Sequence, residues 1–512
     1  MKTLKSNEGC LIVVTGKWFV ILLIVAISQT LLLPSLQAAS EKMEITDSGI
    51  TTEVEKGLIL EKGVFPNDLD VGTSQGIVSL SGSLNNILAK ERAVKIAESI
   101  RGVLGVIDRT TVIPVSRPDE DIRKDVLTAL LQDPATEHYQ ISVSVQGAIV
   151  TLTGAVGSNA EKQLAAQVAE GVRGVKDVVN GVMIDYLAKR TDSEITADIK
   201  DRIQWDIWID GGGINPVVKN GNVILSGTVG SAISESQAFE DAWVNGVSSV
   251  DGNGLKINPE VRQIAQRKFE YTVKSDSEIK QAVQAALRLD PRVTVFFPEV
   301  TADDGSVILG GEVGNLKAKT AAGQDAMNIL GVWRVDNLLK VRLKEWPSDA
   351  EMQRQLKAAL AWDSLLDDSA IDVAVINRVA YLSGGVDSNF QKAEAQDAAS
   401  RIKGVVEVRN HLKVEPDFFI GDYNWPYENS PPFSTSEVFG PQPCPSDLRI
   451  KKNIEHALFW SPFVHRNDIT VNVDGGVATL TGTVGTWVGY EEADKDAHKG
   501  GATAVRNRLK VK

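Results

Sequence analysis

Apolar and polar positions follow two different periods along this chain, and the same order of periods occurs six times. First comes a stretch with an apolar residue at every fourth position, as at Ile122, Val126 and Leu130. This spacing predicts an amphipathic helix with one buried stripe. Two stretches of alternating apolar and polar residues follow, with a Gly-containing turn between them, and they predict a β-hairpin. A second helical stretch and a last strand complete the order α-β-β-α-β.

Each repeat opens with an Asp and contains two Gly at nearly constant distances. The first Gly comes 35 residues after the Asp, and the second comes 19 or 20 residues later. The opening residues are Asp47, Asp119, Asp192, Asp276, Asp349 and Asp447. The first glycines, which we call the register glycines, are Gly82, Gly154, Gly227, Gly311, Gly384 and Gly482. Constant spacing within repeats predicts six small folding units in series.

These recurring residues have structural interpretations. The opening Asp places negative charge in the first turn of a helix, where the helix dipole favours it, so we interpret it as a helix-start residue and not as a catalytic acid. Each register Gly ends a strand pattern, and we expect it to permit a bulge or the close approach of a helix. The second helix has an Ala-rich inner face, but the third and sixth repeats fit this pattern less well, with Asp241 and Lys499 near that face.

The repeats resemble the BON family of bacterial domains. The resemblance rests on the Asp-opened helix, on the Val-x-Leu-x-Gly strand end (residues 150–154 in the second repeat), and on Gly-Val followed by Val-x-Asn-x-Leu-x-Val (residues 408–414 in the fifth). It covers residues 45 to 415 and 446 to 512. It implies an α+β fold, a tandem array of six α-β-β-α-β domains after an N-terminal signal or anchor helix. It also implies a non-enzymatic cell-envelope protein that contacts phospholipid or membrane surfaces.

The predicted boundaries follow the repeats. They are a signal peptide or membrane anchor at 1–39, BON 1 at 45–115, BON 2 at 117–188, BON 3 at 191–258, a spacer at 259–274, BON 4 at 275–344, BON 5 at 347–415, a Pro- and aromatic-rich linker at 416–445, and BON 6 at 446–512.

The N-terminal segment has the pattern of a targeting sequence. Lysines precede an apolar run at residues 18–33, and small residues follow near Ala38 and Ala39, as at a signal-peptidase site. The run is shorter than the roughly 20 residues of a spanning helix, which favours a cleaved signal, while an uncleaved transmembrane anchor is the alternative. Both interpretations place the rest of the chain in the periplasm or cell envelope.

The net charge and the cysteine content limit the functions that we expect for this protein. The net charge is −13, which argues against nucleic-acid binding and against long-range attraction to anionic lipids. We therefore expect any membrane contact to be local and largely apolar. The two cysteines, Cys10 and Cys444, predict no internal disulfide in the exported chain.

Tryptophans supply the candidate contact residues. Trp205, Trp362 and Trp460 end the first helix of the third, fifth and sixth repeats. Rings at a helix end fit either packing between units or contact with a bilayer interface. Trp425 lies in the linker at 416–445, which has seven prolines and seven aromatic residues. That linker fits either a segment packed against its neighbours or an exposed recognition segment.

Familiar catalytic motifs are missing from the sequence. It has no Gly-x-Ser-x-Gly elbow, no phosphate-binding Gly-Lys-Ser/Thr loop, no His-Glu-x-x-His and no paired cysteines. The five histidines are scattered without ligand spacing. We therefore predict no catalytic residues, no cofactor and no metal site, and a protein that is not an enzyme.

The functional prediction is multivalent binding of phospholipid or envelope surfaces by the tandem modules, in osmotic or envelope stress protection. A structural or protein-interaction scaffold, with self-association through the repeats, is the alternative. Ion sensing is a third hypothesis, because a relative in the BON family is associated with potassium binding.

Overall fold

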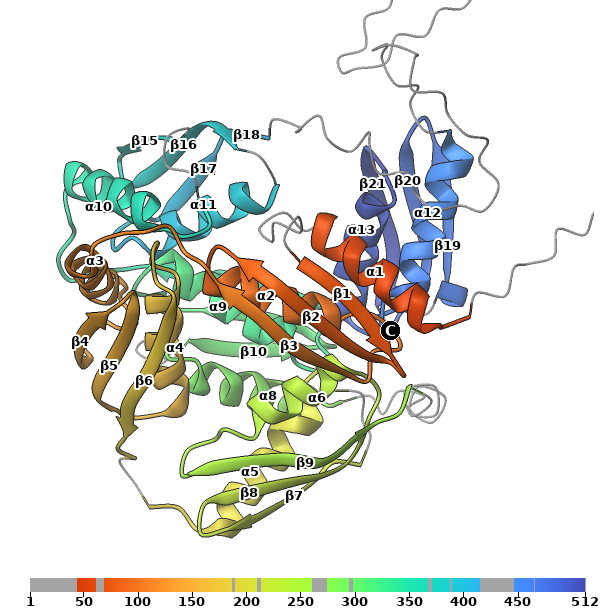
Figure 1. Cartoon of the computed structure of the whole chain (residues 1–512), viewed down its shortest axis with the longest axis horizontal. Helices are drawn as coiled ribbons and strands as arrows, with labels where there is room; N and C mark the ends of the chain where they lie inside the picture. The colour runs from red at the N-terminus through yellow and green to blue at the C-terminus, as the bar shows by residue number, and fades with distance from the viewer. Residues whose placement is uncertain are drawn as a thin grey trace, which may run out of the picture.

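The computed structural model describes residues 44–60, 69–186, 189–209, 213–259, 274–293, 298–366, 371–386, 389–414, 446–464 and 466–511. These residues form six α-β-β-α-β units, which we number 1 to 6 in chain order. The units fold back on one another, so that unit 6 lies beside α1 of unit 1 (Figure 1). Within the described ranges, none of the helices has the length and apolar character needed to span a bilayer.

Each unit begins with a helix of 14 residues. These first helices are α1 (Asp47–Leu60), α3 (Asp119–Gln132), α5 (Asp192–Trp205), α8 (Asp276–Leu289), α10 (Asp349–Trp362) and α12 (Asp447–Trp460). An antiparallel hairpin follows: β1 (Leu69–Ser74) with β2 (Ile77–Leu84), β4 (Gln140–Gln146) with β5 (Ile149–Val156), β7 (Asn215–Lys219) with β8 (Asn222–Val229), β10 (Glu299–Asp303) with β11 (Ser306–Gly310), β15 (Ile371–Ile376) with β16 (Val379–Val386), and β19 (Ile469–Asp474) with β20 (Val477–Val484).

The second helices are α2 (Ile87–Glu98), α4 (Asn159–Glu170), α6 (Ala232–Asp241), α9 (Leu316–Met327), α11 (Asn389–Arg401) and α13 (Trp487–Lys499). A last strand then pairs parallel to the second hairpin strand. The last strands are β3 (Gly105–Val112), β6 (Asp177–Ile184), β9 (Ser249–Ile257), β13 (Arg334–Asn337), β17 (Glu407–Asn410) and β21 (Ala504–Val511). In units 4 and 5 the pairing resumes as β14 (Lys340–Val341), against β12 (Glu312–Val313), and as β18 (Lys413–Val414).

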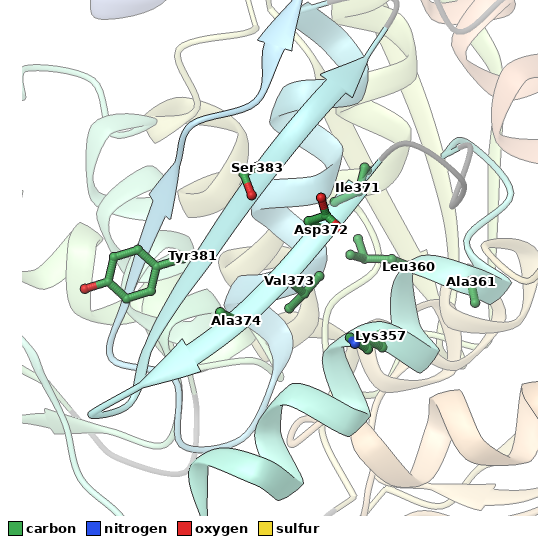
Figure 2. Close-up of a pocket in the computed structure, with 9 residues that line it drawn as sticks. All are labelled: Lys357, Leu360, Ala361, Ile371, Asp372, Val373, Ala374, Tyr381 and Ser383. Carbon is green, nitrogen blue, oxygen red and sulfur yellow. The ribbon is translucent and has the colours of Figure 1, made fainter.

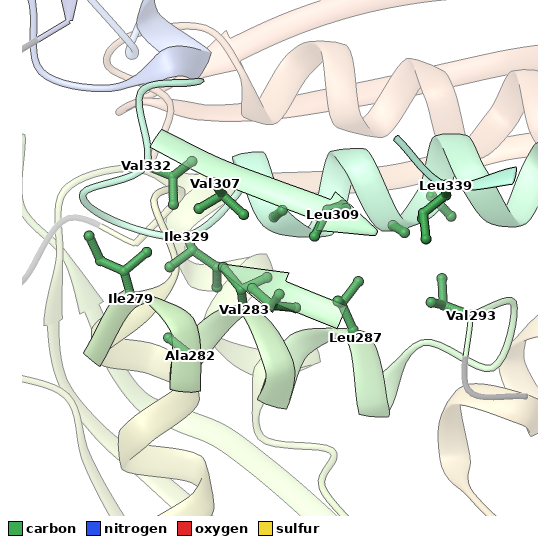
Figure 3. Packing of buried hydrophobic residues seen from close by; sticks show 14 of the residues in the cluster. Ile279, Ala282, Val283, Leu287, Val293, Val307, Leu309, Ile329, Val332 and Leu339 are labelled. Atoms are coloured by element: carbon green, nitrogen blue, oxygen red, sulfur yellow. The ribbon is translucent and has the colours of Figure 1, made fainter. Parts of the chain in front are cut away.

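Every unit has its own hydrophobic core between the two helices and one face of the sheet. In unit 4, Ile279, Val283 and Leu287 of α8 face Val307 and Leu309 of β11 (Figure 3). These helical residues are spaced by four, and the strand residues by two, as the periodicity predicts. Six separate clusters form, one for each unit. Burial on one face therefore drives the formation of each unit.

The opening Asp ties the first helix to the hairpin of the same unit. In unit 2, the Asp119 carboxylate accepts hydrogen bonds from the backbone N–H groups of Gly147 and Ala148, both at 2.8 Å. Units 1, 3, 5 and 6 repeat this pair of bonds. In unit 4, Gly305 donates to Asp276 at 3.5 Å. The Asp begins the helix, as expected, and in addition fixes the hairpin turn, which the sequence analysis did not foresee.

The register glycines of units 2, 3 and 6 lie where the backbone of the neighbouring chain segment approaches closely. All six have positive φ, from 104° to 144°. Gly154 pairs with Ile141 in a continuous ladder, and a Cβ on Gly154 would lie 2.3 Å from the carbonyl oxygen of Gln140. The close neighbour is thus the backbone of the adjacent strand, and the expected approach of a helix does not occur at this position. Gly311 is less crowded, because its nearest atom would be 3.8 Å away.

The mixed α/β architecture, with small three-stranded sheets repeated in tandem, is confirmed. Asp241 and Lys499, which fitted the second-helix pattern poorly, lie within regular helices α6 and α13. The predicted signal or anchor at 1–39, the linker at 416–445, both cysteines and most of the spacer at 259–274 lie outside the described residues.

Candidate functional site

The tryptophan at the end of a first helix joins its unit to another unit. The Trp362 carbonyl of unit 5 accepts a hydrogen bond of 2.7 Å from the Arg173 N–H of unit 2. In return, the Ser364 N–H donates to the Gly171 carbonyl at 3.0 Å. We call this reciprocal pair of backbone bonds the helix-end contact. It is a short antiparallel bridge between two separate units, and it needs no continuous sheet.

The same contact joins units 3 and 4. Here the Leu330 N–H donates to the Trp205 carbonyl at 2.9 Å, and the Ile207 N–H donates to the Asn328 carbonyl at 3.3 Å. The acceptors and donors stand at the same positions of the repeat as in units 2 and 5. The contact is therefore a property of the repeat and not of one pair.

Units 1 and 6 make half of this contact. The Arg101 N–H donates to the Trp460 carbonyl at 2.9 Å, but the residue two positions after Trp460 is Pro462, which has no N–H to donate. The Arg101 guanidinium adds a side-chain bond to the Phe459 carbonyl at 3.2 Å. The pairs are therefore 1 with 6, 2 with 5 and 3 with 4, a nested order that brings the chain back on itself.

The three tryptophan rings pack at these contacts, Trp460 buried and Trp205 and Trp362 half-buried. Trp460 is 6% exposed and belongs to the core cluster of unit 1. Trp205 packs against the core of unit 4, and Trp362 packs against the cores of units 2 and 5. The structure thus places the three candidate surface residues between units. Trp425 lies outside the described residues.

A hollow of about 370 Å³ lies beside strand β15 of unit 5. Figure 2 shows Lys357 on α10 at one side of this strand and Tyr381 pointing away at the other. These polar groups do not converge on one point. The described part of the chain also has no group of three or more His, Cys, Asp or Glu that could hold a metal ion.

Ionisable groups with strongly raised pKa lie between helices. Burial raises the pKa of Asp363, Asp496 and Glu170 to about 7 each. Asp363 ends α10, and Asp496 lies on α13, where it hydrogen-bonds Ser461 at the end of α12. These carboxyl groups are packed at helix junctions, so their chemistry concerns stability.

The open face of the unit 6 sheet is the strongest candidate for a binding surface. Arg506, Arg508 and Lys510 alternate along β21 and are all exposed. Their register neighbours on β20 are threonines, in the pairs Thr479–Arg506, Thr481–Arg508 and Thr483–Lys510. We call these six residues the basic face. Because alternate residues of a strand are about 6.6 Å apart, the three cations form an evenly spaced row.

No acidic side chain neutralises this row within the described residues. Two cations on the last strands of other units are paired: Arg409, which stands at the repeat position of Arg506, with Glu407 at 2.9 Å in unit 5, and Arg334 with Asp336 at 2.9 Å in unit 4. Residues 446–512 contain ten Lys and Arg against eight Asp and Glu, whereas the whole chain has 54 against 67. Unit 6 is therefore a basic module in an acidic protein.

The sequence analysis missed this site. Its signal was the alternation Arg-x-Arg-x-Lys within a predicted strand, which puts all three cations on one face. The net negative charge of the whole chain concealed the local excess of positive charge.

Comparison with known proteins places the fold in a family. The BON domain model matches residues 46–114, 118–185, 191–259, 275–342, 348–416 and 446–512. The chain is similar to osmotically-inducible protein Y of Escherichia coli (strain K12), with 30% identity over 141 residues, 26% of this chain and 70% of that protein. Two solved chains of CdsD, a structural protein of the type III secretion system of Chlamydia trachomatis, match with 14% and 15% identity. They cover 43% and 42% of this chain and 97% and 100% of theirs, at a TM-score of 0.12.

Proposed function

The chain belongs to the BON domain family, and on that premise we propose that it is a non-enzymatic protein of the cell envelope that binds phospholipid surfaces through the basic face of unit 6. The observation that carries this proposal is the unpaired row Arg506, Arg508 and Lys510. The targeting pattern in the first 39 residues supports export. The name of the similar Escherichia coli protein supports a role in osmotic stress.

Electrostatics explains why this face suits an anionic bilayer. Each Lys or Arg held near an anionic membrane surface contributes roughly 1 kcal/mol of attraction. The exposed guanidinium and ammonium groups can donate several hydrogen bonds each to phosphate oxygens, and the threonine hydroxyls can donate more. The contact proposed here is therefore polar and basic. It differs from the largely apolar contact that the sequence led us to expect.

The location of the row also changes the expected binding mode. Six equal modules would bind a surface with avidity, but the paired charges on the sheets of units 4 and 5 offer no comparable row. Binding through one face predicts that the other units act mainly as a folded support for unit 6.

Sedimentation with vesicles tests this function. The exported chain is mixed with vesicles of phosphatidylglycerol and phosphatidylcholine, or of phosphatidylcholine alone. We expect binding to the anionic vesicles, and a loss of roughly 100-fold in affinity when Arg506, Arg508 and Lys510 are all replaced by Gln.

The matched control removes three cations in or directly after the last strands of unit 4, namely Arg334, Lys340 and Arg342, which are also replaced by Gln. It changes the net charge of the protein equally but leaves the basic face intact. Equal losses in the two triple variants would show that only total charge matters. Absence of binding to every vesicle would refute the lipid function itself.

A scaffold is the second candidate, and the helix-end contact favours it. This contact joins units that are far apart in the chain, such as units 2 and 5, through backbone N–H and carbonyl groups. The same geometry can join units of two molecules. A concentration-dependent increase in mass by light scattering, without vesicle binding, would favour this function.

A further inference from the structure

The joint between units 3 and 4 contains two pairs of carboxyl groups beside its helix-end contact. Asp206 and Asp241 form the first pair, at the ends of α5 and α6 in unit 3. Asp290 and Asp325 form the second, at the end of α8 and within α9 of unit 4. In both units the two acids are 35 residues apart and lie at the same distances from the opening Asp, so they occupy equivalent places in the repeat.

In unit 3, the pair shares a single Arg. Arg202 Nε binds Asp241 Oδ1 at 2.8 Å, while Asp241 Oδ2 is buried and receives no N–H or hydroxyl donor among the described residues. Asp206 hydrogen-bonds Asp241 and also accepts from Gln237 Nε2 at 3.0 Å. Because a bond between two carboxyl groups needs a proton, one of them must be neutral. The Arg202 ion pair holds the negative charge on Asp241, and the proton belongs to Asp206.

In unit 4, the arrangement is the same with the roles exchanged between helices. Arg292 binds Asp290 through Nε at 2.9 Å and through Nη2 at 2.5 Å, which holds the negative charge there. Asp325 hydrogen-bonds Asp290, and Asp325 Oδ2 is buried without a donor among the described residues. The proton therefore belongs to Asp325.

Charge balance requires both protons. The joint has four carboxyl groups and two guanidinium groups, so full ionisation would leave two uncompensated negative charges in a largely buried place. One proton on each pair makes the joint neutral. An uncompensated buried charge is strongly destabilising, because desolvation is not offset.

The other charged groups around the joint do not replace these protons. Arg202 faces Asp325 as well as Asp206 and Asp241, but it is already bound to Asp241. On the far side of unit 4, Asp397 faces Arg292. Lys274 lies over the Trp205 ring, 4.5 Å from its centroid, and Tyr139 of unit 2 faces Asp290.

We propose that the joint between units 3 and 4 is a proton-dependent latch, which stays closed while Asp206 and Asp325 each retain a proton and opens as these protons are lost. The Asp206 carboxyl is next to the contact itself, since Asp206 forms the backbone bridge to Ile329 of unit 4. Loss of its proton therefore acts directly on the backbone bonds that hold the units together.

The sign of the pH effect follows from linkage. Burial, with the negative charge of Asp241 second, raises the pKa of Asp206 well above its usual range. Burial and the charge of Asp290 do the same for the pKa of Asp325. A raised pKa in the closed form means that the closed form binds the proton more tightly. Acid therefore keeps the latch closed, and rising pH opens it.

Amide hydrogen exchange of the full exported chain measures this opening. The amides of Leu330 and Ile207 donate the two bonds of the helix-end contact, so their protection reports the closed state. Between the ordinary and the raised pKa, each proton released on opening changes the opening equilibrium about tenfold per pH unit. Release of two protons predicts that protection, corrected for intrinsic exchange, falls roughly 100-fold per pH unit.

Replacement of each protonated Asp by Asn distinguishes this latch from a general stabilisation of the whole protein at low pH. Asp206→Asn and Asp325→Asn keep a donor toward the ionised partner and remove the titrating proton. In each single variant, we expect the protection of the Leu330 and Ile207 amides to fall only about tenfold per pH unit. In the double variant, we expect this protection not to depend on pH. Asp241→Asn and Asp290→Asn leave Arg202 or Arg292 without its counter-charge, so they should weaken the joint at every pH.

The matched joint between units 2 and 5 provides the control. In the Asp206→Asn and Asp325→Asn variants, protection of the Arg173 and Ser364 amides should equal that in the parent at each pH. A pH slope at Leu330 and Ile207 that is unchanged in the double variant would overturn the proposal. So would a slope that changes equally at all four amides.

Discussion

At the scale of single residues, the repeat depends on a few positions whose backbone geometry leaves little choice. The register glycines are the clearest case, since all six have positive φ and a Cβ on Gly154, Gly227 or Gly482 would lie within 2.3 Å of a carbonyl oxygen. The opening aspartates are the second case, because one carboxylate satisfies two turn amides and orients the hairpin relative to the first helix.

Replacement of a register Gly tests the first of these cases. Gly154→Ala should lower the free energy of unfolding by about 2–4 kcal/mol, because the methyl group meets the Gln140 carbonyl and the backbone is strained. Gly311 shares the positive φ, but a Cβ there would have no neighbour closer than 3.8 Å. The Gly311→Ala variant should therefore lose less unfolding free energy. Denaturant unfolding of both variants measures the difference, and equal losses would contradict the steric explanation.

The buried Asp496 gives a pH dependence at this scale. Burial raises its pKa to about 7, so the folded state retains a proton that the unfolded state has lost. Stability from this group is fully present in acid and declines by up to roughly 1.4 kcal/mol per pH unit as pH rises toward 7. Asp496→Asn should remove that share of the decline, as measured by thermal unfolding between pH 4 and pH 8. An unchanged pH profile would show that Asp496 does not titrate in this range.

At the scale of elements, the C-terminal ends of the first helices also bind another unit. The same turn that ends α5 and α10 also supplies the backbone groups that bind another unit. Unit 6 differs by one residue, Pro462, and so its contact with unit 1 has one backbone bond instead of two. The backbone at the preceding residue is alike in both cases, with φ −64° and ψ 129° at Asp363 and φ −69° and ψ 128° at Ser461.

This similarity of backbone conformation predicts that Ser and Pro can be exchanged between positions 364 and 462. Ser364→Pro is compatible with the extended backbone of Asp363 but removes the donor to Gly171, so it should cost about 1 kcal/mol or more at the contact between units 2 and 5. Pro462→Ser restores a donor toward unit 1, and protection of the Arg101 amide should rise. Hydrogen exchange measures both, and protection that falls in both variants would contradict the assigned roles.

At the scale of the whole molecule, the six units form nested pairs, and the chain is not an open string. Further contacts cross between pairs, such as the ion pair of Lys317 with Asp397 and the hydrogen bond that Ser236 Oγ donates to Glu98 at 2.9 Å. Packing between units buries Trp460 and part of Trp205 and Trp362. The sheet faces remain as the open surfaces of the units, and only that of unit 6 carries an unpaired basic row among the described residues.

The dependence of vesicle binding on salt concentration therefore distinguishes the proposed polar contact from an apolar one. The screening length falls from about 10 Å at 0.1 M salt to about 3 Å at 1 M. Binding of the exported chain to anionic vesicles should weaken strongly over this range. The Gln variant of Arg506, Arg508 and Lys510 should show little dependence on salt. Binding that persists at 1 M would point to the apolar contact that the sequence first suggested.

The sequence by itself determined the number of the units and the order of helices and strands in each. Periods of four and two, together with Asp and Gly at constant spacing, specify α-β-β-α-β because these signals act within about 70 residues and reflect local geometry. The sequence also flagged Asp241 as out of place on an inner helix face, but it could not supply Asp206 as the partner of Asp241.

Only the tertiary structure decided how the units pair, that Trp205, Trp362 and Trp460 pack between units, and which sheet face stays basic. Each of these depends on contacts between segments hundreds of residues apart, as between Arg101 and Trp460. Such contacts follow from the complementarity of whole surfaces, which periodicity along the chain does not encode.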